Sequence, residues 1–265
     1  MAIVNRSFYI YPVQSDDTLY SIAKKLGSQI SLIERANALY PPFTDPGLIY
    51  PGERLLVPVF YDNQINQIIS RGDTLYGIAR SYSTTIDLLQ GLNPEIQHPT
   101  FIYIGQVLRV PVFIYEVEQG DTLNAIAQRL GWSLSAILQA NENRPGFSPD
   151  VIFPGYQLII PSPSSANILV LRPFPGAKLR NGQTLKGYAR AFEGNILYQL
   201  RDDNGQKVIK ETAVQTSSGA PSYGTFSVSM NFDTLPSASR GELWIYTRSA
   251  KDGSIQDLIK IRVTF

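Results

Sequence analysis

The string Asp-Thr-Leu occurs three times in this chain of 265 residues, and no other feature restricts the fold as strongly. The copies begin at Asp17, Asp73 and Asp121, so they are 56 and 48 residues apart. Self-similarity at this spacing is typical of chains built from tandem structural units. We therefore expect one small fold repeated three times.

The residues around each Asp-Thr-Leu string follow one pattern. Before the string, two residues alternate with a period of two and predict a short strand; they are Tyr11 and Val13, Gln67 and Ile69, and Tyr115 and Val117. After it, apolar residues at i, i+3, i+4 and i+7 predict an amphipathic helix; they are Leu19, Ile22, Ala23 and Leu26, then Leu75, Ile78, Ala79 and Tyr82, then Leu123, Ile126, Ala127 and Leu130. We expect each aspartate to be the helix N-cap, and Gly27 and Gly131 to follow the helix end in the left-handed conformation.

A second helix and a closing strand complete each unit. The second helix ends at an asparagine, which tolerates the left-handed conformation of a helix end; these residues are Asn37, Asn93 and Asn141. A proline-rich loop leads to a closing strand, which ends at Pro58, Pro111 or Pro161 because proline cannot donate to a ladder. Each unit is thus predicted to be strand–helix–helix–strand, with its two strands antiparallel.

This pattern resembles the LysM module, with copies at residues 8–58, 66–111 and 113–161. Asp16 occupies a position where the family usually has glycine, and Ile104 replaces the proline of the other copies. The resemblance implies a non-catalytic protein that binds N-acetylglucosamine-containing glycan. In LysM modules the glycan groove lies between the strand-1/helix-1 loop and the helix-2/strand-2 loop.

The resemblance carries this groove onto seven residues in each copy. They are Asp16, Asp17, Thr18, Leu19, Asn37, Ala38 and Leu39; Gly72, Asp73, Thr74, Leu75, Asn93, Pro94 and Glu95; and Gly120, Asp121, Thr122, Leu123, Asn141, Glu142 and Asn143. Aspartates at helix starts serve as caps more often than as sugar ligands. We therefore expect backbone N–H and C=O groups to contact the glycan hydroxyls and acetamides. Tyr20 and Tyr76 lie off the apolar helix face, and a surface position or packing between repeats explains them better than sugar stacking.

The tandem arrangement raises avidity, because several weak sites on one polymer increase the effective concentration of each later contact. The connector between Pro111 and Tyr115 is very short. It therefore favours packing of the second copy on the third.

The last hundred residues differ in character. Ser162–Ala166 is expected to be a linker. Seven predicted strands follow, which suits an immunoglobulin-like sandwich of residues 167–265; they are Ile168–Leu171, Thr184–Phe192, Ile196–Asp202, Lys207–Thr216, Gly224–Phe232, Glu242–Arg248 and Gln256–Phe265. The complete chain is thus predicted to be multidomain α+β, with three βααβ modules and an all-β domain.

The strings at residues 172–173, 187–193, 223–226 and 249–254 resemble the immunoglobulin-like domain of bacterial spore germination proteins, often called Gmad2. The resemblance implies a spore or cell-wall context. Glu193 follows an aromatic residue at the end of a predicted strand, and a structural hydrogen bond explains it better than a ligand site.

Composition excludes several chemistries. Cysteine is absent, so disulfides, thiolate metal sites and cysteine nucleophiles are excluded. The formal net charge of +1 does not favour nucleic-acid binding, although residues 1–161 carry −4 and residues 162–265 carry +5. We expect no cofactor, metal or membrane span, and the first residues contain no apolar signal segment. The single histidine, His98, lies in a loop, and no catalytic triad is apparent.

The sequence therefore predicts a wall or spore-envelope anchor that binds peptidoglycan or a chitin-like polymer and contacts another protein through its β-domain. A spore-coat scaffold with degenerate grooves is the first alternative. A peptidoglycan hydrolase is the second, since a pair of carboxylates would suffice. Spore proteins made in the mother cell need no signal peptide, which fits a spore location.

Overall fold

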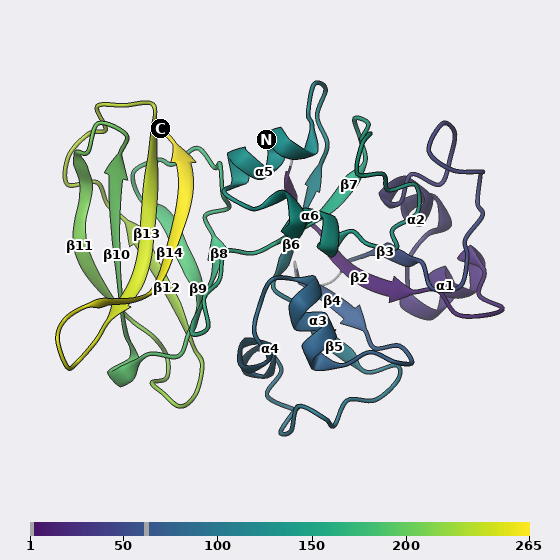
Figure 1. The fold of residues 1–265 in the computed structure, drawn as a ribbon, viewed down its shortest axis with the longest axis horizontal. Helices are drawn as coiled ribbons and strands as arrows, with labels where there is room; N and C mark the ends of the chain where they lie inside the picture. Colours follow the sequence, from purple (N-terminus) through teal and green to yellow (C-terminus); the bar gives the residue numbers. More distant parts are fainter. Residues whose placement is uncertain (1–2, 61–63) are drawn as a thin grey trace. The chain divides into compact units, whose positions relative to one another are not determined.

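The computed structural model describes residues 3–60 and 64–265, and the chain divides into two compact units. The first consists of Met1–Ala127 and Ser133–Pro161, and the second of Gln128–Trp132 and Ser162–Phe265. No helix in the described ranges is long and apolar enough to cross a bilayer. Figure 1 shows the α-helices in the repeat region and a C-terminal region built from β-sheets with one short 3-10 turn, so the predicted fold class is confirmed.

Each repeat has the predicted order of strand, two helices and strand. The first contains β2 (Ser7–Pro12), α1 (Leu19–Leu26), α2 (Ile30–Ala36) and β3 (Arg54–Val59). The second contains β4 (Ile65–Ile68), α3 (Leu75–Ser81), α4 (Ile86–Leu92) and β5 (Val107–Arg109). The third contains β6 (Val112–Glu116), α5 (Leu123–Leu130), α6 (Leu134–Ala140) and β7 (Gln157–Pro161). The two strands of each repeat pair antiparallel.

The helix caps correct one prediction. The threonine, and not the aspartate, caps the first helix of each repeat. Thr18 and Thr74 accept the backbone N–H of Ser21 and Gly77 at 3.0 Å, and Thr122 accepts that of Ala125 at 3.1 Å. A threonine hydroxyl satisfies an orphan amide as a carboxylate would, and this frees the aspartate for another contact.

Of the two predictions for the helix ends, one is confirmed and one is wrong. Gly27 has a φ of 66° and Gly131 a φ of 73°, so the predicted left-handed glycines are confirmed. The asparagines that end the second helices are not left-handed: φ is −116° for Asn37, −131° for Asn93 and −106° for Asn141. Their side chains have another role, described below.

The first two repeats share a sheet, and all three repeats share one core. β2 pairs parallel with β4, so the first two repeats form one sheet of order β3-β2-β4-β5. β1 (Ile3–Val4) pairs with β6 and adds the chain's first described residues to the sheet of the third repeat. A single apolar cluster includes Phe8 of the first repeat, Ile78 of the second and Ile114 of the third. The predicted contact of the second and third repeats runs through α3 and α6, which lie side by side in Figure 1.

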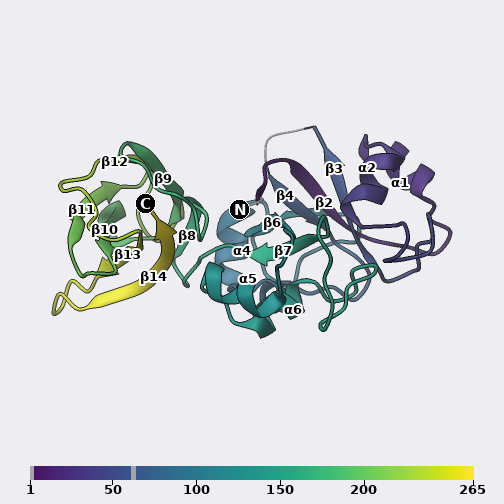
Figure 2. The same cartoon turned by 90° about the horizontal axis from the view of Figure 1, so that it is seen from above.

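The second unit consists of two antiparallel sheets that appear as separate layers in Figure 2. One has the order β12-β9-β8 and the other β11-β10-β13-β14. Their bounds are β8 Ile168–Arg172, β9 Gln183–Ala189, β10 Asn195–Asp202, β11 Lys207–Gln215, β12 Gly224–Met230, β13 Arg240–Arg248 and β14 Ile255–Thr264. All seven predicted strands are present. The predicted strand Thr184–Phe192 ends early, at Ala189, and Phe192–Gly194 forms a 3-10 turn instead.

The segment expected to be a linker is hydrogen-bonded to β8. The backbone N–H of Ser165 donates to Ile168, and that of Val170 donates to Pro163. Ser162 is buried as well. These residues therefore belong structurally to the second unit.

Candidate functional site

The strand-1/helix-1 loop is held by its aspartate. In the first repeat, Asp17 Oδ2 accepts the hydroxyl of Tyr11 at 2.8 Å and the backbone N–H of Gln14 at 2.8 Å. Burial, with the hydrogen bond and the charge of Asp17, raises the pKa of the Tyr11 hydroxyl, so this hydroxyl remains a donor. The carboxylate thus links the strand to the loop that leaves it.

The third repeat has the same arrangement and the second a variant of it. Asp121 Oδ2 accepts Tyr115 Oη at 2.5 Å and Glu118 N at 2.9 Å. In the second repeat Gln67 replaces the tyrosine, and Asp73 accepts the N–H of Ser70 at 2.8 Å.

The side chain of Gln67 is held from the next helix. Tyr82 Oη donates to Gln67 Oε1 at 2.7 Å, and burial raises the pKa of Tyr82 to about 12. Gln67 Nε2 in turn donates to Asp73 Oδ2 at 3.5 Å, so Gln67 and Tyr82 together take the place of the single tyrosine of the other repeats.

Each loop turns at a left-handed residue just before the aspartate. Gly72 has a φ of 87° and Gly120 a φ of 84°, and Asp16 adopts the same conformation with a φ of 68°. Aspartate is among the few residues that tolerate this region. The replacement of glycine in the first repeat therefore preserves the loop conformation.

The helix-2/strand-2 loop begins at the buried asparagine. Asn37 Nδ2 donates to Ile33 O and to Leu56 O, both at 2.7 Å, and Asn37 Oδ1 accepts Leu56 N at 2.7 Å. Asn93 and Asn141 make equivalent bonds to the end of α4 and β5, and to the end of α6 and β7. The asparagine side chains clip the helix to the closing strand and, being buried, do not face a ligand.

The remaining candidate residues divide by exposure. The side chains of Leu19, Leu75 and Leu123 and of Ala38 and Leu39 are buried in the core. The exposed candidates are Asp16, Thr18, Gly72, Thr74, Pro94, Glu95, Gly120, Thr122, Glu142 and Asn143. Backbone groups and short polar side chains therefore form most of the accessible surface of the two loops.

The two loops meet at one end of each module. Val13, the residue after β2, accepts the N–H of Gly52 at 3.0 Å and donates to Glu53 at 2.8 Å. Ile69 with Gly105 and Gln106, and Val117 with Gly155 and Tyr156, form the same pair of bonds. The turn before the closing strand is thus joined to the residue from which the strand-1/helix-1 loop starts.

This turn presents exposed apolar side chains that the sequence argument missed. In the first two repeats they are Leu48 and Tyr50, and Phe101 and Tyr103, which are 48%, 58%, 62% and 70% exposed. Val151 and Phe153 occupy the same register in the third repeat. Their signal was present: an apolar residue on each side of one isoleucine, before a glycine, in all three copies. Repeated exposure of this kind indicates a binding surface.

The third repeat differs because its second loop packs against the first repeat. The carbonyl of Asn143 accepts Arg54 N–H at 2.8 Å, and the ring of Phe153 lies 5.0 Å from that of Phe43. The buried guanidinium of Arg144 donates to Ala36 O at 3.2 Å and to Gln157 O at 3.1 Å. This loop is therefore partly used for contact between modules.

The other singled-out residues are surface features. Tyr20 and Tyr76 are about two-thirds exposed, so packing between repeats does not account for them. The ring of His98 is exposed and its Nδ1 lies 2.8 Å from Thr100 Oγ1. Glu193 is left-handed, with a φ of 52°, and its carbonyl accepts Gln215 Nε2 at 2.8 Å.

Several known proteins are similar to parts of this chain. The endolysin of Bacillus phage B103 is 38% identical over 101 residues, which cover 37% of this chain and 36% of the endolysin. The secreted LysM effector ECP6 of Passalora fulva is 29% identical over 181 residues, covering 57% and 76%. The crystal structure of the Bacillus cereus spore cortex-lytic enzyme SleL is 31% identical, covers 42% of this chain and 23% of that chain, and has a TM-score of 0.29. The chain spans well under half the length of several curated relatives.

Two family models match the chain. The immunoglobulin-like domain of bacterial spore germination matches residues 167–254. The LysM domain matches residues 11–58, 68–111 and 115–161, which together make up just over half of the sequence. The chain therefore belongs to the LysM family, with three LysM domains followed by an immunoglobulin-like domain of the spore germination type.

Proposed function

We propose that this protein binds peptidoglycan without cleaving it and so anchors itself to the bacterial wall or spore envelope. LysM domains indicate binding of N-acetylglucosamine polymers, and the second family model suggests association with the wall or the spore. The proposal further states that the chain is an anchor rather than an enzyme. The sporulation-specific glycosylase of Bacillus subtilis is matched over 22% of its own length and the phage B103 endolysin over 36%, whereas the amidase sle1 of Staphylococcus saprophyticus is matched over 52%. Each of these enzymes thus contains residues that the match does not cover, and the proposal assigns their activity to those residues.

The observation that carries the proposal is the loop pair at the end of each module. Its exposed residues are glycines, threonines, a few acidic or amide side chains, and the apolar side chains of the turn. Backbone amides and carbonyls match the acetamide and hydroxyl groups of an N-acetylglucosamine unit. The exposed apolar residues can cover the sugar ring face, where Tyr50 and Tyr103 would act in the first two modules.

A shared core supports the use of the three modules together. Because the first two modules share a sheet and all three share one apolar cluster, their loops are held at fixed separations. A rigid array raises avidity only when one polymer, or neighbouring polymers, can reach more than one site. A glycan network offers many strands at close spacing, which suits such an array.

Sedimentation with insoluble peptidoglycan tests the proposal. We expect the full-length chain to sediment with the polymer, to be released by N-acetylglucosamine oligomers, and to liberate no reducing sugars on long incubation. Release of reducing sugars would identify a hydrolase. A chain that stays in the supernatant at every polymer concentration would contradict the anchor.

A spore-coat scaffold with degenerate grooves is the second candidate. The contacts of Asn143 and Phe153 with the first module favour it, because they use part of one loop pair for protein packing. In this case the chain would bind coat proteins and fail to bind peptidoglycan. Under the main proposal, the C-terminal unit supplies the protein contact and the LysM modules supply the wall contact.

A further inference from the structure

The sheet β11-β10-β13-β14 has an outer face that is rich in cationic and aromatic side chains. Alternation along the strands defines this face: Leu200, Leu243 and Ile245 are buried in the core, so the residues between them point outward. Trp244 lies at the centre, paired across the sheet with Gln199 of β10 and Lys260 of β14. We call this surface the outer sheet face.

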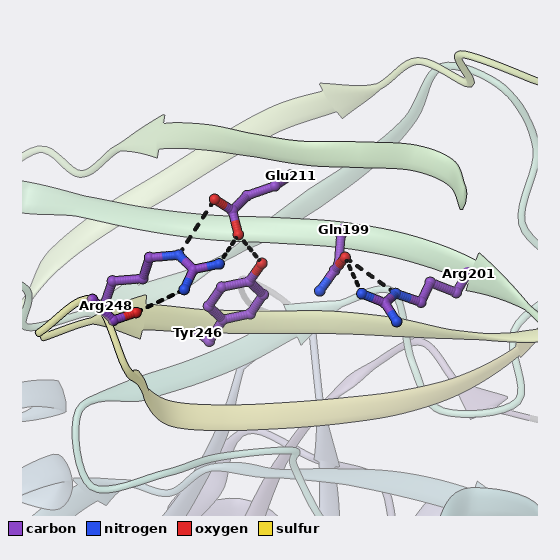
Figure 3. A network of polar contacts seen from close by, with 6 residues as sticks. Gln199, Arg201, Glu211, Tyr246 and Arg248 are labelled. Carbon is purple, nitrogen blue, oxygen red and sulfur yellow. Dashed lines mark hydrogen bonds and ion pairs between the residues drawn. The ribbon is translucent and has the colours of Figure 1, made fainter. Parts of the chain in front are cut away.

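The buried side chain of Gln199 positions Arg201 on this face. Gln199 is 5% exposed, and its Oε1 accepts Arg201 Nε at 3.2 Å and Arg201 Nη2 at 3.1 Å (Figure 3). The Arg201 guanidinium also lies 4.8 Å from the centre of the Trp244 ring. A charged group held by two hydrogen bonds and a ring loses little further freedom on binding.

The carboxylates of the face are already engaged. Glu211 Oε2 accepts Arg248 Nη2 at 2.6 Å and Tyr246 Oη at 2.5 Å, as Figure 3 shows. Glu242 accepts the Trp244 indole N–H at 3.0 Å and lies 3.4 Å from Arg262. Glu211 is thus paired with Arg248, and Glu242 shares Arg262 with Asp203, which lies 3.2 Å from the same guanidinium nitrogen.

Two cations remain without a carboxylate. Arg201 and Lys260 come from the strands on either side of β13 and both approach the Trp244 ring, Lys260 at 4.3 Å. Within residues 3–60 and 64–265, neither forms an ion pair. Trp244 thus has on each side a cation without an ion pair in the described residues, in a region of net charge +5, and Glu242 is the cross-strand neighbour of Arg201.

We propose that the outer sheet face binds an acidic protein segment whose carboxylates pair with Arg201 and Lys260 and whose chain contacts Trp244. Tryptophan, tyrosine and arginine are enriched at the centres of protein interfaces, and the planar arginine fork fits a carboxylate. Charge complementarity then selects an acidic partner. This inference rests on the proposed role of the C-terminal unit as the protein-binding part.

Binding of a labelled decaglutamate peptide to the full-length chain tests this inference, by fluorescence anisotropy at low salt. We expect R201Q/K260Q to bind about tenfold more weakly than the wild type, since each lost charge pair contributes modestly at an exposed site. The matched control is R180Q/K186Q, which removes the same two charge types from exposed positions outside this face. It should bind within about twofold of the wild type.

The single variant K260Q controls for misfolding of the double variant, because the Lys260 side chain donates no hydrogen bond in the described structure. It should weaken binding about threefold. Three results would overturn the acidic protein partner. The control R180Q/K186Q could lose as much affinity as R201Q/K260Q, or the wild type could fail to bind the peptide. The wild type could also bind a polyphosphate with ten charges more tightly than the peptide. R201Q/K260Q should still sediment with peptidoglycan, so failure here is distinct from failure of the wall anchor.

Discussion

The Tyr11 hydroxyl donates a 2.8 Å hydrogen bond to the Asp17 carboxylate, and this contact ties the first strand of a LysM module to its candidate glycan loop. The same carboxylate accepts a backbone N–H of the loop. The aspartate of the repeated Asp-Thr-Leu string is thus a brace for the loop rather than a helix cap.

Removal of this brace should weaken glycan binding through the loop. We expect Asp17→Ala to lower the free energy of unfolding by about 1–3 kcal/mol, because it leaves the buried Tyr11 hydroxyl without its acceptor. Chemical denaturation measures the stability and calorimetry the affinity. A sharp loss of affinity with unchanged stability would instead make the carboxylate a direct sugar ligand.

The buried Asn37 side chain should contribute more to stability than the Asp17 carboxylate. Asn37→Ala removes three buried hydrogen bonds, one to α2 and two to β3, and we expect a loss of about 2–4 kcal/mol in denaturant unfolding. The exposed Asn181, whose Oδ1 accepts one backbone N–H, offers a control for loss of an amide at the surface. If N37A were no more destabilising than N181A, the clip would not hold the helix to the strand.

The exposed turn residues should affect binding and not stability. Tyr103→Ala removes a ring that is 70% exposed, and we expect about a threefold to tenfold loss of affinity for N-acetylglucosamine oligomers. Leu235→Ala, at a residue 82% exposed in the C-terminal unit, is the matched control. An equal affinity of Y103A and the wild type would remove this ring from the glycan surface.

The carboxylate of Glu211 should give the C-terminal unit a dependence on pH. The hydrogen bonds from Arg248, then from Tyr246, lower the pKa of Glu211 in the folded state. A group with a depressed folded pKa stabilises the fold above its unfolded pKa and loses this contribution as the pH falls through the folded value. Thermal unfolding of the wild type should therefore lose more stability than E211Q below about pH 4. If the stability of the wild type and of E211Q fell in parallel with pH, the Glu211 carboxylate would not contribute to this pH dependence.

The sequence predicted the order of elements because the helical and strand periods are local. It did not predict the role of Asn37, because the partner strand residue Leu56 lies 19 positions away and only the fold brings the two together. Pairing of Ile3 with Tyr115 and the packing of Phe43 on Phe153 have no local pattern at all. The repeated string locates the candidate loops, whereas Tyr50 and Tyr103 lie in the proline-rich loop, whose sequence has no helical or strand period to show which side chains are exposed.

Backbone amide shifts during a titration with an N-acetylglucosamine tetramer test the central claim most directly. We predict that ¹H–¹⁵N signals of Gly72–Leu75 and of Glu95 move together and saturate, while a glucose tetramer leaves them unchanged. Shifts confined to other surfaces, or none at millimolar ligand, would contradict a glycan site formed by the main chain of these two loops.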